Sequence, residues 1–269
     1  MSILAEILVK DRWIRIANSK VQRSPEYSVE IADIISNHLT DYASFYGLSA
    51  EEIIKIYNNF TRQYSEHIRV FLSTGNYPFQ NNIVPDLKRI DYDIVLILSV
   101  VLSIHRHRIF VELHKSAQQI KGNVLLIGIG SGVELDLLNS LNHDVHAYDI
   151  SISDFIKKKY TGIELHETFF EGDSEKYCNI FAIELLEHLS QPIDFVKMSY
   201  DSLTHKGKFY FTTATNIPQI DHLYNFNDKK GWEQSLKDLG FDILVSEQID
   251  HESIDSKLMA SNTWYITKK

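Results

Sequence analysis

From residue 123 to the end of the sequence, short apolar runs alternate with segments of helical periodicity. Such alternation predicts an α/β fold in which a mainly parallel sheet carries helices on its two faces. The last two runs have no helical segment between them, so we expect them to pair antiparallel at one edge. The expected strands are residues 123–127, 143–148, 163–170, 179–184, 207–213, 241–248 and 259–267, and the expected helices are residues 133–141, 192–203 and 228–239.

The residues before this region have the pattern of helices. Ser49 and Glu52 have the spacing of a capping box, and apolar residues then recur at helical spacing until Gly75. We also expect a helix over residues 25–39 and one long helix over residues 91–119. The sequence therefore predicts an all-helical region at residues 1–120 and an α/β domain at residues 121–269.

Composition and charge limit which partners and which cellular location we expect for this chain. A formal net charge of -9 gives the chain no overall attraction for polyanions, which makes nucleic acid an unlikely partner. Cys178 is the only cysteine, so no intrachain disulfide can form, as suits a reducing cytoplasm. The most apolar run, residues 94–104, is too short to span a bilayer, and charges interrupt residues 1–20 where a signal peptide needs an apolar stretch. We expect a cytoplasmic protein without membrane attachment, and a homodimer stays open.

The sharpest local signal is a group of glycines directly after the strand expected at residues 123–127. Closely spaced glycines between a strand and a helix let the backbone approach a ligand that side chains would block. Asp149 ends the next expected strand, where an acid can accept hydrogen bonds from both ribose hydroxyls of an adenosine group. The expected cofactor-binding residues are Gly128, Ile129, Gly130, Gly132, Asp149 and Ile150.

The G-x-G-x-G spacing resembles the first motif of the class I S-adenosylmethionine-dependent methyltransferases. Residues 179–189, 203–213 and 239–242 resemble later segments of that family in the same order. The resemblance implies a Rossmann-like seven-stranded sheet and S-adenosylmethionine as cofactor. Leu126 stands where the family usually has an acid, and the adenine-side residue stays open between Thr168 and Asp173. An NAD-dependent oxidoreductase is the alternative enzyme class, although the glycine spacing argues against it.

Two carboxylates and an imidazole cluster after the strand expected at residues 179–184. Glu184, Glu187 and His188 lie at its carboxyl end, where ligands bind in open α/β sheets, and His222 follows the next strand. Carboxylate and imidazole ligands suit Mg²⁺, Mn²⁺, Zn²⁺ or Fe²⁺. We therefore take these four residues as candidate metal ligands. If no metal binds, His188 or His222 is the candidate general base, and a purely structural turn is the third interpretation.

This E-x-x-E-H pattern with a later histidine is similar to the metal site of small-RNA 2'-O-methyltransferases and of ubiquinone-pathway O-methyltransferases. The resemblance implies a metal that helps an acceptor hydroxyl to lose its proton before methylation. The acidic charge favours a small-molecule acceptor over RNA. The helical region, rich in Tyr and Phe, would then cover the site. A non-catalytic binding protein with the same fold is the main alternative function.

Two basic runs complete the candidates. Residues 105–108 (His-Arg-His-Arg) could meet an acidic group of the substrate, but a solvated helix face is the preferred interpretation. Residues 157–159, three consecutive lysines, are expected in a solvated loop.

Overall fold

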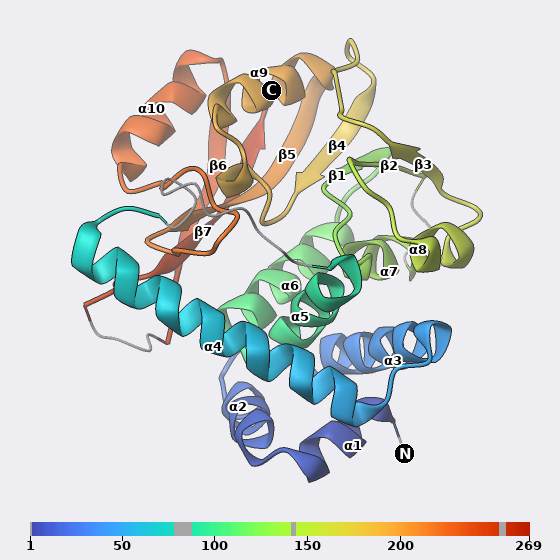
Figure 1. Cartoon of the computed structure of the whole chain (residues 1–269). Helices are drawn as coiled ribbons and strands as arrows, with labels where there is room; N and C mark the ends of the chain where they lie inside the picture. The colour runs from blue at the N-terminus through green and yellow to red at the C-terminus, as the bar shows by residue number, and fades with distance from the viewer. Residues whose placement is uncertain (1, 78–87, 141–143, 253–256) are drawn as a thin grey trace.

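The computed structural model describes residues 2–77, 88–140, 144–252 and 257–269. One seven-stranded sheet with the order β3-β2-β1-β4-β5-β7-β6 organises the second half of the chain (Figure 1). Strands β1 to β5 run parallel, and β7 runs antiparallel between β5 and β6. This confirms the predicted α/β sheet and the antiparallel pairing of its last two strands. The strands are β1 (Val124–Ile127), β2 (Val145–Asp149), β3 (Glu164–Glu167), β4 (Tyr177–Ala182), β5 (Leu203–Thr215), β6 (Asp242–Asp250) and β7 (Ser261–Lys268).

The first part of the chain is helical, as predicted. Its longest helix, α4, begins with the expected capping box, in which Ser49 and Glu52 satisfy each other's backbone amides. Helix α4 passes below the carboxyl ends of the parallel strands (Figure 1). The helices are α1 (Ile3–Lys10), α2 (Arg12–Gln22), α3 (Val29–Tyr46), α4 (Ala50–Thr74), α5 (Arg89–Leu102) and α6 (Ile104–Ala117), then α7 (Val133–Ser140), α8 (Asp154–Lys159), α9 (Pro192–Ser202) and α10 (Lys229–Asp238).

The single long helix predicted for residues 91–119 is wrong, because the chain bends by 88° at Ser103 between α5 and α6. One partner from α2 and one from α6 itself bond to the carbonyls that the break leaves open. The side-chain amide of Asn18 donates to the carbonyl of Val101 at 3.0 Å. The Nδ1 of His107 lies 3.0 Å from the carbonyl of Val100. Within the described residues no single helix is long and apolar enough to cross a membrane, and only the bent pair α5–α6 reaches that length and composition.

The same region corrects the prediction of a solvated face at residues 105–108. Arg106 and His107 are buried, and His107 is fully enclosed. The Nε2 of His107 accepts a hydrogen bond from the Ser28 amide at 2.9 Å, so Nδ1 must carry the proton that it gives to the α5 carbonyl. The lysines at residues 157–159 also differ from expectation, because they close helix α8 and Lys159 pairs with Asp136 at 2.9 Å.

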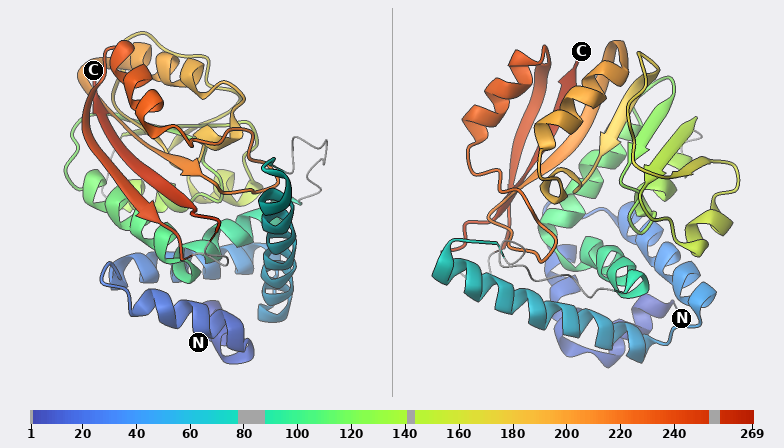
Figure 2. Two further views of the ribbon diagram at one scale, coloured as in Figure 1. Left: turned by 90° about the vertical axis from the view of Figure 1, so that its left-hand side faces the viewer. Right: turned by 45° about the horizontal axis from the view of Figure 1, so that its top comes forward.

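Two hydrophobic cores cover the two faces of the sheet. The first joins α1, α3, α5 and α6 to inward side chains of β1 and β2, such as Leu126 and Ala147. The second lies under α9 and α10 and includes Val196 and Trp232. The helical region thus supplies helices for one face of the sheet, and α9 and α10 cover the other (Figure 2).

Candidate functional site

The glycine turn after β1 has the geometry that its sequence predicts. Gly128 and Gly132 have φ angles of 82° and 87°, which L side chains rarely adopt. A Cβ at Gly128 would lie 3.2 Å from the side chain of Leu185, and one at Gly132 would lie 3.1 Å from Ile156. Glycine is therefore needed here for backbone conformation and for close packing.

A cavity of about 580 Å³ opens beside this turn. Asp149 lies in its wall, where its carboxylate accepts hydrogen bonds from the amides of Gly130 and Ser151, each at 3.0 Å. Of the predicted cofactor residues, Gly128, Gly130, Asp149 and Ile150 line the cavity. Ile129 lies in the hydrophobic core, and Gly132 packs against α8. Thr168 lines this cavity, whereas Asp173 lines a different hollow, next to α9.

Arg89, which the sequence reasoning missed, supports the glycine turn from the helical region. Its guanidinium donates to the carbonyls of Gly130 and Ser151 and pairs with Asp93 at 2.9 Å. Asp93 also accepts a hydrogen bond from Tyr42 at 2.9 Å. Burial raises the pKa of Asp93 to about 6, although the Arg89 charge opposes this. These contacts hold the glycine turn in place. The acid expected at position 126 from the family resemblance is absent, because that position is the buried Leu126.

Glu134, at the start of α7, is a second residue that the motif did not reveal. Its side chain is buried in the wall of the same cavity as Asp149. Burial raises the pKa of Glu134 to about 7, with Arg106 opposing the shift and the charges of Glu184 and Asp149 adding to it. In the sequence, Glu134 is recognisable only as an acidic residue in the first turn of an expected helix.

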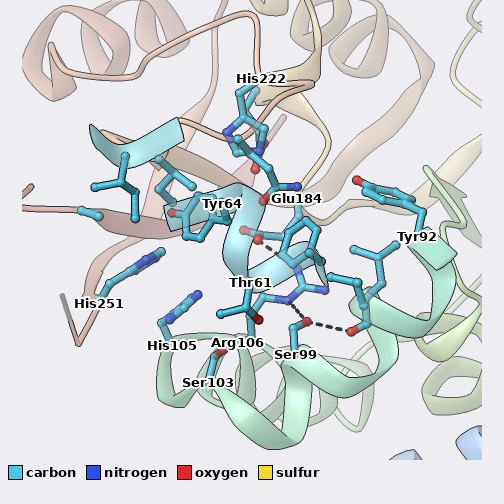
Figure 3. A pocket seen from close by; sticks show the side chains of 18 of the residues that line it. Thr61, Tyr64, Tyr92, Ser99, Ser103, His105, Arg106, Glu184, His222 and His251 are labelled. Carbon is cyan, nitrogen blue, oxygen red and sulfur yellow. Dashed lines mark hydrogen bonds and ion pairs between the residues drawn. The ribbon is translucent and has the colours of Figure 1, made fainter. Parts of the chain in front are cut away.

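A second cavity, of about 260 Å³, lies between α4 and the carboxyl ends of the strands (Figure 3). Helix α4 contributes an aromatic wall that contains Tyr57, Phe60 and Tyr64. Polar side chains from α5 and α6 and from the loops that follow β4, β5 and β6 line the other walls. Five residues belong to the walls of both cavities, which therefore adjoin: Tyr92, Leu96, Arg106, Glu184 and His188.

The structure brings three of the four predicted metal ligands together beside this cavity. Carboxylate and imidazole atoms of Glu187, His188 and His222 lie within 4.8 Å of one another. The 3-10 turn η2 (Leu186–His188) carries the first two. The backbone carbonyl of Glu187 accepts hydrogen bonds from the amides of Leu223 and Tyr224, so the turn and the loop after β5 are held side by side.

The cluster contains polar atoms without internal partners. Glu187 Oε2 and His222 Nδ1 are buried and find no hydrogen-bond partner among the described residues. Burial, then the nearby Glu184 charge, raises the pKa of Glu187 well above its ordinary value. Burial, then the His188 charge, lowers the pKa of His222 to about 3. A divalent cation would satisfy both orphaned atoms, so this donor set fits a metal.

Glu184, the fourth predicted ligand, does not belong to this three-residue group, because its carboxylate has other partners. Its carboxylate pairs with Arg106 at 2.9 Å and accepts a hydrogen bond from the Asn262 amide at 2.5 Å. Its φ of 53° is a strained backbone value for a non-glycine residue, of the kind that clusters at functional sites. Arg106, which belonged to the run expected to be solvated, thus lines both cavities, and Figure 3 shows it beside Glu184 in the second one.

No protein-family model matches the sequence, and no curated protein matches it either. Similar solved structures include a putative sarcosine dimethylglycine methyltransferase from Galdieria sulphuraria, with 10% identity, a TM-score of 0.49 and coverage of 61% of this chain and 84% of that one. A second is the 1,6-didemethyltoxoflavin-N1-methyltransferase of Burkholderia thailandensis, with 16% identity, a TM-score of 0.47 and coverage of 70% and 92%. A third is a putative S-adenosylmethionine-dependent methyltransferase from Listeria monocytogenes, with 13% identity, a TM-score of 0.48 and coverage of 60% and 97%. The strand order, with β7 antiparallel between β5 and β6, is a seven-stranded Rossmann-like sheet of the kind that the sequence resemblance implies.

Proposed function

We propose that this chain is an S-adenosylmethionine-dependent methyltransferase that transfers a methyl group to an oxygen atom of a small-molecule acceptor. The observation that carries the proposal is the shared wall of two adjoining cavities. One contains the glycine turn and Asp149, and the other contains the Glu187, His188 and His222 cluster. Two molecules bound in these cavities would meet at Arg106 and Glu184, which is the geometry that group transfer requires.

In this proposal the first cavity binds the cofactor, which supplies an electrophilic methyl group. Each oxygen of Asp149 already accepts one backbone hydrogen bond and has room for a second, so the carboxylate can also accept the ribose hydroxyls. Thr168 is the better of the two adenine-side candidates, because it lines the cavity. The acids in the same wall, Glu134 among them, disfavour the pyrophosphate of a dinucleotide and so the oxidoreductase alternative.

Glu187, His188 and His222 would hold the metal. A divalent cation held there would lower the pKa of an acceptor hydroxyl and so make it a better nucleophile toward the methyl group. The orphaned buried atoms of Glu187 and His222 support this assignment. Without a metal, His188 or His222 is the candidate general base, and the low pKa of His222, about 3, makes it a weak proton acceptor.

The second cavity suits an acceptor that is small and largely planar. Its volume of about 260 Å³ is at the lower end of ligand pockets, and the α4 wall offers aromatic faces for stacking. Its acids, Glu184, Glu187 and Glu252, disfavour a polyphosphate backbone. We therefore propose a small hydroxylated molecule over RNA.

Calorimetric titration with S-adenosylmethionine and S-adenosylhomocysteine tests the cofactor, and transfer of labelled methyl to a panel of hydroxylated acceptors with and without Mg²⁺, Mn²⁺ or Zn²⁺ tests the reaction. Glu187→Gln should remove the metal dependence and leave cofactor affinity unchanged. Glu252→Gln is the matched control, an acid of the same cavity outside the cluster. Absence of binding by either cofactor form would refute the methyltransferase proposal and favour a binding protein with this fold.

A further inference from the structure

Strands β2 and β3 place a second group of ligand-type side chains on one face of the sheet edge. In the parallel register His146 stands opposite Glu164, and Tyr148 stands opposite His166. Glu164 and His166 are two residues apart on one strand, so their side chains point to the same face. The neighbours on β2, Val145 and Ala147, point into the hydrophobic core on the other face.

The carboxylate of Glu164 lies between the two imidazoles. One oxygen is 3.2 Å from Nδ1 of His146, and the other is 2.9 Å from Nε2 of His166. All three ligand atoms lie within 4.8 Å of one another. Both nitrogens are buried, and although each lies within ion-pair distance of the carboxylate, neither makes a hydrogen bond within the described chain. Two buried imidazole nitrogens beside a carboxylate form a set of donor atoms that a cation would satisfy.

Aromatic neighbours fix the orientation of both rings. His166 stacks on Tyr148 with ring centroids 4.2 Å apart, and His146 packs against the edge of Tyr177 at 5.6 Å. Ligands held by packing in this way need little reorganisation to bind a metal. The side chain of Glu164 is 58% exposed, which leaves a route for an ion from solvent.

We propose that His146, Glu164 and His166 form a binding site for a divalent transition metal of the Zn²⁺ class, separate from the cluster beside the acceptor cavity. Two imidazoles and one carboxylate favour Zn²⁺, Co²⁺, Ni²⁺ or Cu²⁺ over the harder Mg²⁺ and Ca²⁺, with water completing the coordination. The bound ion would tie the four-residue edge strand β3 to β2. Because Thr168 follows β3 and lines the cofactor cavity, the site would also stabilise that wall.

The test uses Zn²⁺ alone, titrated in competition with a chromophoric chelator into the tag-free full-length chain carrying His222→Ala, which weakens the other cluster. We expect one equivalent of Zn²⁺ to bind. Glu164→Gln should weaken this binding at least about tenfold, and His166→Gln should do the same. Glu167→Gln is the matched control on the same strand: it faces the other side and pairs with Lys157 at 2.8 Å, so it should leave the affinity unchanged.

Two results would overturn the proposal. The first is a His222→Ala chain that does not compete with the chelator. The second is equal Zn²⁺ affinity in the Glu164→Gln, His166→Gln and Glu167→Gln chains, which would indicate adventitious binding. Circular dichroism establishes whether each variant is folded. If one of the two ligand substitutions unfolds the edge strand, the other still tests the proposal. None of these readouts depends on methyl transfer.

Discussion

At the scale of single residues, Asp149 has two roles in the proposed function, since it orients the glycine turn and lines the cavity proposed for the cofactor. Asp149→Asn should weaken S-adenosylhomocysteine binding about 10- to 100-fold, because hydrogen bonds to a charged group contribute about 1.5–3 kcal/mol each. Calorimetry measures the loss. Asp154→Asn, an exposed acid at the start of α8, should change the affinity little. Equal affinity in the two variants would remove Asp149 from the ribose site.

Glu134 should make cofactor binding depend on pH. Its carboxyl group is half ionised near pH 7, and a positively charged ligand favours the ionised form. The affinity for the cationic S-adenosylmethionine, relative to S-adenosylhomocysteine, should therefore rise by up to about tenfold between pH 6 and pH 8. Titrations of both ligands at the two pH values measure this ratio. In Glu134→Gln the ratio should stay constant, and a ratio that still rises would assign the effect to another group.

The same group predicts a pH dependence of stability. A carboxyl group whose pKa is raised from 4.5 to about 7 on folding stabilises the fold while it is protonated. The free energy of unfolding should fall as pH rises from about 4.5 through 7, by about 3 kcal/mol for this group. Urea unfolding across this range should show a shallower decline in Glu134→Gln than in the parent chain. Identical slopes would contradict the raised pKa.

Residue types at the site were predictable from the sequence, but their pairings were not. The glycine turn and Asp149 follow from local spacing, because the backbone conformation is local. The E-x-x-E-H spacing with the later His222 predicts four metal ligands, yet Glu184 pairs with Arg106, a partner that the packing of α6 against the sheet supplies. Tertiary placement of this kind has no signal in the spacing of residues 184–188.

At the scale of elements, two serines that cap helices should differ in their contribution to stability. Ser49 makes a full capping box at α4, whereas the structure gives Ser103, at the start of α6, no side-chain cap bond within the described chain. Ser49→Ala should lower the free energy of unfolding by about 1 kcal/mol, and Ser103→Ala by less than about 0.5 kcal/mol. Denaturant unfolding of both variants compares them directly. A larger cost at Ser103 would show that the break at residue 103 depends on its side chain.

The break between α5 and α6 also shows what sequence patterns miss. Residues 91–119 contain neither proline nor glycine, so their pattern predicts an uninterrupted helix. The break is stabilised instead by Asn18 and His107, which bond the carbonyls that it leaves open. The capping box of α4 was predictable because both partners lie within four residues of each other. The break at Ser103 was not predictable in this way, because Asn18, which bonds to the carbonyl of Val101, lies 83 residues from it in the sequence.

At the scale of the whole molecule, the helical region and the sheet share one hydrophobic core. Side chains from α3, α5 and α6 pack on the same face as Leu126 and Trp264. A chain of residues 121–269 alone would expose that face, so we expect it to lack cooperative unfolding and measurable S-adenosylhomocysteine affinity. Thermal unfolding and calorimetry test this, and removal of residues 1–23 is the milder comparison. Full affinity in residues 121–269 would show instead that the two regions are independent.

The shared wall of the two cavities has a thermodynamic consequence. Arg106 and Glu184 contact whatever occupies either side, so any adjustment made for the first ligand alters the site of the second. Such a coupling free energy is reciprocal, because the factor by which one ligand changes the affinity of the other must hold in both directions. An acceptor that tightens cofactor binding must itself bind more tightly to the cofactor-loaded protein. Acceptors can therefore be sought by their effect on cofactor affinity, before any product is detected.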